Sequence, residues 1–288
     1  MTARKIDRRH FLGSAGATAA FLAMHDFSLA GAQTGAAPQP EPGRPRILSL
    51  DLLTGANMNA MKTFYGKTLD LRLMDERADR FSVEAGETRL TFVTSAGADG
   101  GRAPFYHFAF TIPENKILQA LEWQKARTPL LAIPERNRAA GYPDEVVDYR
   151  HWNAHSIFFL DPAGNVLEYI ARHDLKNDNT AKFDWADLLY ISEIGLVVDD
   201  VPAVAGKVRE IASMPQYKGG DAEFTAVGDE YGLVLVMKRG RVVDFTGNAE
   251  HGVRVYSTSV NLRGAKSAKH QLKDYPYTIN VEERCSCA

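Results

Sequence analysis

Cysteine is scarce in this sequence: its 288 residues include only Cys285 and Cys287, both at the C-terminal end. Their position excludes a zinc ribbon, an iron–sulfur cluster, a disulfide framework and a cysteine nucleophile in the core. A Cys-Ser-Cys triplet can chelate a soft metal ion, but at a chain terminus we favour an exposed tail.

Long apolar runs are also missing. No stretch of about 18 apolar residues is present, which excludes an integral membrane protein with helical spans. The formal net charge is only −2, from 34 basic and 36 acidic residues. Because these charges are interspersed, no basic stripe can neutralise phosphates, and no nucleic-acid partner is expected. A hydrophobic fraction of 45% is typical of a globular protein with one large or two medium domains.

Residues 1–32 contain the parts of an export signal in the usual order. A basic start leads into a mildly apolar stretch from Phe11 to Leu29, and Ala30-Gly31-Ala32 forms a small-x-small cleavage site. Arg8-Arg9-His10-Phe11-Leu12 resembles the twin-arginine motif. The resemblance implies a periplasmic or otherwise exported protein, carried across the membrane by the twin-arginine export machinery; the alternative is a disordered basic arm. Residues 33–45, rich in proline, glycine and alanine, are expected to form a linker.

A strand–helix–three-strand pattern (βαβββ) occurs three times, near residues 46–96, 104–173 and 189–262. Each copy begins with alternating residues, continues with apolar residues at helical spacing, and ends in strands joined by a glycine-bearing turn. The hairpins of the three copies read FSVEAGETRLTFV, IFFLDPAGNVLEYI and FTAVGDEYGLVLVM. In the second, the turn Asp161–Asn165 has proline where φ is pre-set and glycine or asparagine where φ is positive.

Two segments of the second copy, PFYHFAFTI (104–112) and WNAHSIFFLDPAGNVLEYIARHD (152–174), resemble the vicinal oxygen chelate superfamily. The end of the first helix, Phe64-Tyr65-Gly66 with Leu69-Asp70-Leu71, shares this resemblance. The superfamily includes glyoxalase I, extradiol ring-cleavage dioxygenases, fosfomycin-resistance enzymes and bleomycin-binding proteins. The motif Phe-x-Asp-Pro-x-Gly-Asn-x-x-Glu, ending at Glu168, is fairly specific for this fold but not for any one reaction.

The resemblance implies an α+β fold of repeated βαβββ modules, in which two modules pair into an open, cup-like barrel. With three copies present, we expect the first two to pair. The chain then divides into the paired modules 1 and 2 (46–173), a third module (174–264) and a C-terminal tail (265–288).

The resemblance further implies a divalent metal site inside the cup, held by His107 and Glu168. Strand alternation is consistent with this, because His107 shares a face with Ala109 and Thr111, while Glu168 shares a hairpin face with Ser156 and Phe158. One imidazole and one carboxylate suit Fe(II), Mn(II), Zn(II) or Ni(II). The alternatives are a core histidine and a glutamate paired with an arginine.

Two ligands rarely hold a divalent ion tightly, so a third ligand is expected. Asp51 is one candidate, since it shares a face with Ser49, the position that matches His107 in the first unit. His155 is the other, although alternation puts it one residue off the inward face unless a β-bulge redirects it. His155, as acid or base, and Ser156, as a hydroxyl contacting substrate, are the candidates for a catalytic role.

The third unit carries Glu193 at the strand position of His107 but Val236 at that of Glu168, so its ligand pair is incomplete. We interpret Glu193 as a structural or salt-bridged residue, because an isolated buried carboxylate is costly. Since the units pair in twos, the third is expected either to form a homodimer contact or to cap the first pair.

Two functions remain open. The first is an exported, divalent-metal-dependent enzyme of dioxygenase, lyase or isomerase type that acts on a small oxygenated substrate and stabilises its developing negative charge. The second is a metal-free protein of the bleomycin-resistance type that binds and sequesters a ligand. His107 and Glu168 favour the enzyme, whereas the lack of a matching ligand in the first unit favours the binding protein.

Overall fold

The computed structural model describes residues 44–95, 103–242, 252–264 and 267–283. The expected signal peptide, most of the linker, and Cys285 and Cys287 lie outside these residues. Within them, no helix has both the length and the apolar character needed to cross a membrane.

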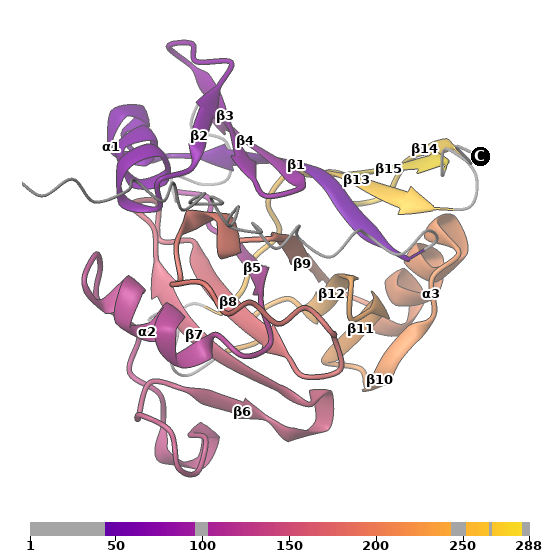
Figure 1. Ribbon diagram of the computed structural model, residues 1–288. Helices are drawn as coiled ribbons and strands as arrows, with labels where there is room; N and C mark the ends of the chain where they lie inside the picture. Colours follow the sequence, from indigo (N-terminus) through magenta and orange to yellow (C-terminus); the bar gives the residue numbers. More distant parts are fainter. Residues whose placement is uncertain (1–43, 96–102, 243–251, 265–266, 284–288) are drawn as a thin grey trace, which may run out of the picture. The chain divides into compact units, whose positions relative to one another are not determined.

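The first of two sheets contains seven strands in the order β14-β15-β13-β1-β4-β3-β2 (Figure 1). It combines the first module with strands from the C-terminal end of the chain. Its strands are β1 (Arg46–Thr54), β2 (Arg72–Met74), β3 (Arg80–Ala85), β4 (Thr88–Thr94), β13 (Thr258–Gly264), β14 (Ala268–Gln271) and β15 (Tyr277–Glu283).

The second sheet contains eight strands in the order β10-β11-β12-β9-β5-β8-β7-β6, and it combines the second and third modules. Its strands are β5 (His107–Ile112), β6 (Val147–Tyr149), β7 (Ala154–Leu160), β8 (Val166–Arg172), β9 (Tyr190–Val198), β10 (Gln216–Gly220), β11 (Phe224–Asp229) and β12 (Gly232–Lys238).

Three α-helices connect the first and second strands of the modules. They are α1 (Met58–Thr63), which continues as the π-helical turn η1 (Phe64–Thr68), α2 (Ile117–Lys125) and α3 (Val201–Ala212). Short 3-10 turns lie at η2 (Glu135–Asn137), η3 (Arg150–Trp152) and η4 (Trp185–Asp187). Local signals explain α3: the side chain of Asp200 accepts from Ala203 N at its start, and Ser213 ends it in the left-handed region.

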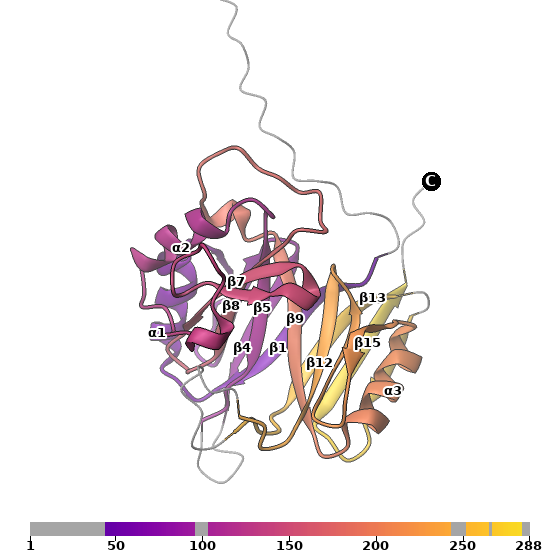
Figure 2. The ribbon, with the colours of Figure 1, turned by 90° about the horizontal axis from the view of Figure 1, so that it is seen from below.

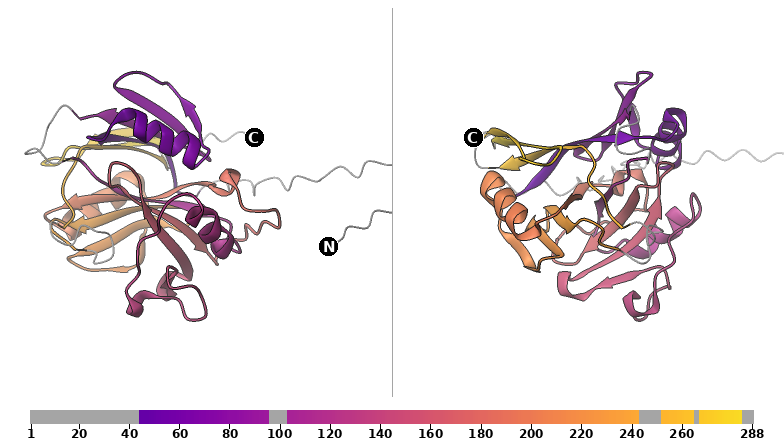
Figure 3. Two further views of the ribbon diagram at one scale, coloured as in Figure 1. Left: turned by 90° about the vertical axis from the view of Figure 1, so that its left-hand side faces the viewer. Right: turned by 180° about the vertical axis from the view of Figure 1, so that it is seen from behind.

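The two sheets lie one above the other, as Figures 2 and 3 show, with the buried faces of both in one hydrophobic cluster. β1 contacts β9 and β12 across the layers, and α3 contacts strands of both sheets. The apolar positions that alternate along β1 and β5, such as Leu50, Leu52, Phe108 and Phe110, fill this space. The sequence-based α+β class and the three βαβββ copies are therefore confirmed.

In each copy the first and last strands run parallel: β1 with β4, β5 with β8, and β9 with β12. The expected pairing of the first two modules needs correction. Instead, β5 pairs antiparallel with β9 of the third module, and β1 pairs antiparallel with β13. β13 and β15 are parallel as well, so the last strands complete the first sheet as a partial fourth copy without a helix.

This pairing changes two expectations about the C-terminal half. The third module finds its partner within the same chain, so the reason for expecting a homodimer through it no longer holds. Part of the segment expected to be a tail, 267–283, forms the edge strands β14 and β15. The sequence pattern alone favoured neighbouring modules as partners, because β13–β15 lack the helix that marks a module.

The turn at 161–165 ties the second module to the first. Asp161 accepts hydrogen bonds from Ala163 N at 2.8 Å, from Asn165 Nδ2 at 2.7 Å and from the Tyr65 hydroxyl of η1 at 2.8 Å. Gly164 has a φ of +80°, as the turn motif predicts. Asn165 in turn accepts from Tyr106 N at 2.8 Å, so one motif anchors the hairpin, the start of β5 and the first helix.

We expect Asp161→Ala to lower the free energy of unfolding by about 3 kcal/mol, because several buried donors lose their acceptor. Tyr65→Phe removes one of these bonds and should cost about 1 kcal/mol. Urea unfolding of residues 33–288 measures both. Arg72→Ala, which removes an exposed ion pair with Glu84, is the control and should change stability by less than about 1 kcal/mol. An Asp161→Ala effect as small as the control would contradict this role.

Candidate metal and ligand-binding site

The eight-stranded sheet curls around a cavity of about 440 Å³ on the face directed away from the first sheet. Its walls are mostly apolar and aromatic and include Tyr149, Trp152, Phe158, Phe224 and Leu235. This size and lining are typical of a pocket for a small molecule.

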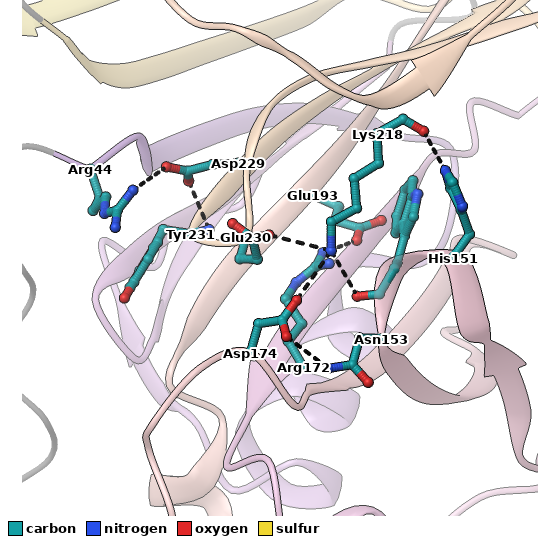
Figure 4. Close-up of polar contacts among 11 residues, drawn as sticks. Arg44, His151, Asn153, Arg172, Asp174, Glu193, Lys218, Asp229, Glu230 and Tyr231 are labelled. Carbon is teal, nitrogen blue, oxygen red and sulfur yellow. Dashed lines mark hydrogen bonds and ion pairs between the residues drawn. The ribbon is translucent and has the colours of Figure 1, made fainter.

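Contacts between the two ends of the sheet close the curl (Figure 4). Lys218 of β10 lies 3.2 Å from Asp174 and 3.5 Å from Glu230, and it donates to Trp152 O at 3.4 Å. The ring of Trp152, in η3 after β6, meets the ring of Tyr217 edge-on with centroids 5.2 Å apart. The first and last strands of the sheet order thus approach each other. Most of the cavity lining comes from the second and third modules, and Tyr256, Thr258 and Tyr277 border it from the C-terminal part of the chain.

Three side chains converge at the wall of the cavity: His107, Glu168 and Glu193. His107 Nε2 lies 3.4 Å from Glu168 Oε2 and 3.9 Å from Glu193 Oε2. One ligand atom from each residue lies within 4.8 Å of the others. Both carboxylates are 2% exposed, so water does little to screen their charges.

Strand register explains why these residues meet. Ala109 of β5 lies opposite Glu168 of β8 on one side and opposite Glu193 of β9 on the other. His107 precedes Ala109 by two residues and points to the same face. The small side chain of Ala109 therefore lies between two carboxylates, with the imidazole beside them.

Hydrogen bonding fixes the orientation of the His107 ring. Its Nδ1 lies 3.0 Å from the carbonyl oxygen of Val166, a group that can only accept. In neutral His107 the proton is therefore on Nδ1, and the lone pair of Nε2 faces the two carboxylates. An arrangement of three lone-pair donors around one point requires a proton or a cation between them.

Arg172 is the fourth charged residue of this site. Its guanidinium is fully buried and forms a hydrogen-bonded ion pair with Glu193 Oε1 (Figure 4). Arg172 Nε and Nη1 have no hydrogen-bond partner among the described residues, and neither has Glu168 Oε1.

These neighbours separate the two glutamates electrostatically. Burial raises the pKa of Glu168 to about 8, helped by the charge of Glu193, while His107 and Arg172 act in the opposite sense. Burial also raises the pKa of Glu193, but Arg172 and His107 outweigh it and hold that pKa below its usual value. For His107, burial lowers the pKa, and the two glutamates more than compensate, so the net direction is upward.

The structure brings together His107 and Glu168, the two residues expected as ligands, but not the expected third candidates. Asp51 is exposed on β1 of the other sheet. His155 lies on the outer face of β7, where it contacts His173 instead. Ser156 is fully buried on the cavity side of β7, two pairs along from the Phe158–Glu168 pair, and its hydroxyl has no hydrogen-bond partner among the described residues.

Glu193 occupies the third position. The interpretation of Glu193 as salt-bridged holds, since it pairs with Arg172, but it also joins His107 and Glu168. Sequence reasoning missed Arg172, although alternation along β8 places residues 168, 170 and 172 on one face.

Among the described residues, the equivalent junction of the first sheet holds no group of three metal-ligating side chains. There Ser49 of β1 accepts from Asn261 Nδ2 of β13 at 2.7 Å, and Asn261 Oδ1 accepts from Asn280 Nδ2 of β15 at 2.6 Å. Neutral side chains therefore occupy the Ser49–Asn261 position of the strand pair that corresponds to β5 and β9.

The ion pair between Arg172 and Glu193 generates a stability prediction. Arg172→Met leaves Glu193 buried without its cation and should lower the free energy of unfolding by about 3–5 kcal/mol. The double variant Arg172→Met with Glu193→Leu removes both charges and should recover most of this loss. Chemical denaturation measures the free energy of unfolding of both variants. Lys207→Ala, which removes one partner of the exposed Lys207–Glu210 ion pair, is the control. Equal losses in the single and double variants would contradict a charge-pair role.

The sequence and the fold are similar to those of known proteins. Residues 46–169 match the model of the Glyoxalase/Bleomycin resistance protein/Dioxygenase superfamily. A proposed dioxygenase from Bacillus subtilis has a similar structure, with a TM-score of 0.50 and 12% identity over 84% of this chain and 86% of that chain. No curated protein matches the sequence.

Two further solved structures are similar at lower TM-scores. Glyoxalase I from Zea mays has a TM-score of 0.47 and 11% identity over 83% of this chain and 92% of that chain. A glyoxalase/bleomycin resistance protein/dioxygenase from Nocardioides has a TM-score of 0.34 and 24% identity over 49% of this chain and 91% of that chain. Over residues 46–169 the chain is thus similar to the Glyoxalase/Bleomycin resistance protein/Dioxygenase superfamily.

Proposed function

We propose that the protein is a divalent-metal-dependent enzyme of dioxygenase, lyase or isomerase type that acts on a small oxygenated substrate. The observation that carries the proposal is the convergence of His107 Nε2 with carboxylate oxygens of Glu168 and Glu193 at the wall of the cavity. One imidazole and two carboxylates form a donor set suited to Fe(II), Mn(II), Zn(II) or Ni(II).

The residues present fit such an ion in two respects. Glu168 Oε1 is buried and has no hydrogen-bond partner among the described residues, so one strong acceptor is left unused. When both carboxylates are ionised, the one fixed cation, Arg172, compensates only one of them. A divalent cation held by His107, Glu168 and Glu193 would satisfy both.

With an ion bound, the residues of the cavity would have separate roles. A bound ion supplies Lewis-acid stabilisation of negative charge that develops on substrate oxygens. Arg172 holds the carboxylate of Glu193, and the Val166 carbonyl holds the His107 ring, so that the ligands are oriented before substrate arrives. The aromatic walls around Trp152 and Phe158 exclude water and contact the apolar part of the substrate.

A second candidate function is a metal-free protein that binds and sequesters a ligand in the same cavity. The raised pKa of Glu168 favours this alternative. A proton retained on Glu168, together with the Arg172–Glu193 ion pair, would balance the charge without a metal ion. The two functions differ in the presence of a tightly held ion and in turnover of a substrate.

Elemental analysis of residues 33–288, purified without affinity metals, tests the proposal. We expect close to one divalent ion per chain at this site, lost in His107→Ala and reduced in Glu168→Gln and Glu193→Gln because each removes a donor. Asp51→Asn is the control and should keep the ion. Turnover is then sought with catechols and α-ketoaldehyde adducts. If the folded protein contains no ion and still binds these compounds, the enzyme proposal is wrong and the ligand-binding function is supported.

We further propose that the twin-arginine motif directs export to the periplasm. Replacing Arg8 and Arg9 by lysine should leave the precursor in the cytoplasm, because the export machinery is expected to read this pair. Cell fractionation and immunoblotting of both forms measure the result. Mature protein in the periplasm of cells that express the double variant would contradict the assignment.

A further inference from the structure

A group of two histidines and one glutamate lies on the outer face of the curled sheet, opposite the cavity. His155 Nδ1 of β7 is 2.7 Å from His173 Nε2, which follows β8 directly. His173 Nδ1 is in turn 2.7 Å from Glu114 Oε2, just beyond the end of β5. Residues from β7 and from the segments that follow β5 and β8 thus supply a carboxylate, an imidazole and a second imidazole in line.

Strand register separates this group from the cavity. His155 pairs with Ala171 of β8 and with Asp148 of β6, so all three share one face with His173, two residues beyond Ala171. The neighbouring pair Phe158 and Glu168 points to the other face. The group is therefore distinct from the cluster of His107, Glu168 and Glu193.

Proton positions define what the two imidazoles offer. The carboxylate of Glu114 can only accept, so His173 carries its proton on Nδ1 and presents a lone pair at Nε2. His155 must then donate from Nδ1 to close the 2.7 Å contact. If His155 carries this proton on Nε2 instead, both facing nitrogens have a free lone pair, and a cation can replace the shared proton without any net release of protons.

The spacing suits a transition metal. Two nitrogens bound at about 2.0–2.1 Å from one ion lie roughly 2.9–3.4 Å apart, for angles between square and tetrahedral. From the observed 2.7 Å, the nitrogens must separate by a few tenths of an ångström, and the rings must also turn so that the two lone pairs converge on an ion beside the N···N line. Neither ring is fully buried, since the side chain of His173 is 26% exposed and His155 is half-buried, so this small movement and the entry of an ion are both feasible.

We propose that His155 and His173 form a second, peripheral site for a divalent transition-metal ion of the Zn(II), Ni(II) or Cu(II) type. Glu114 orients His173 as the outer carboxylate that metal-bound histidines commonly have. Asp148, directly opposite His155 across the β6–β7 pair, lies on the same face, where its carboxylate accepts from Arg150 Nε at 2.7 Å. The ring of Tyr142, with its centroid 4.3 Å from that of His155, covers one side of the site.

Zinc chloride titration against a competing chelator tests the proposal on residues 33–288 first stripped of metal. The wild type should bind one zinc ion more than either His155→Ala or His173→Ala. His107→Ala should keep the peripheral ion, which separates this site from the cavity. Glu114→Gln should still bind but about 10–100-fold more weakly, since it loses only the orienting contact. His270→Ala, a half-buried histidine of β14, is the matched control and should equal the wild type.

A second measurement needs no variant protein. In nitrogen-15 spectra of the histidine side chains, zinc should shift the resonances of His155 Nδ1 and His173 Nε2 and lock the His155 proton on Nε2. The proposal is overturned if these two resonances do not respond to saturating zinc. It is equally overturned if His155→Ala and His173→Ala both bind as many zinc ions as the wild type with unchanged affinity.

Discussion

The antiparallel pairing of β5 with β9 is the contact on which the site depends. It places Glu193 of the third module beside Ala109, whose other neighbour is Glu168 of the second module. Two carboxylates buried this closely are unstable on their own, so the structure requires the nearby Arg172 and His107. The electrostatics of the cavity thus result from joining two modules, and neither module contains the cluster alone.

The shape of the cavity depends on the same junction. An eight-stranded sheet presents two edges, and here the curl brings residues near both edges into contact through Trp152, Tyr217 and Lys218. These contacts combine aromatic packing with ion pairs to Asp174 and Glu230. A cavity whose wall is closed by side chains, without a continuous backbone ladder, can widen with little loss of secondary structure.

Much of the local structure was predictable from the sequence. The alternating segments became β1, β5 and β9, and the helical spacings became α1, α2 and α3, because periodicity reports directly on which face is buried. The Asp161–Asn165 turn was equally readable, since its residues satisfy each other's hydrogen bonds within a few positions. Strand alternation also placed His107 and Glu168 on the cavity face.

The choice of partner strands was less predictable. The register of β5 against β9 shifts between Ala109 and Phe110, and this irregularity decides which residue of β9 faces the cavity. The sequence placed Glu193 at the strand position of His107 in its own module. Glu193 was not recognised as a neighbour of His107 because the first and second modules were expected to pair, whereas β5 pairs with β9 of the third module. For His155, alternation gave the correct face. It placed His155 off the inward face, and in the structure His155 contacts His173 on the opposite face of the sheet.

The pairing of β1 with β13 has a consequence for biosynthesis. About 200 residues separate these two strands. One edge of β1 therefore stays uncovered until β13, close to the C-terminal end of the fold, has been synthesised. Contacts this distant in sequence are slow to form, and an uncovered strand edge invites pairing with other chains. A nascent or prematurely terminated chain that ends before β13 would present such an edge, which makes it a natural substrate for chaperones and proteases.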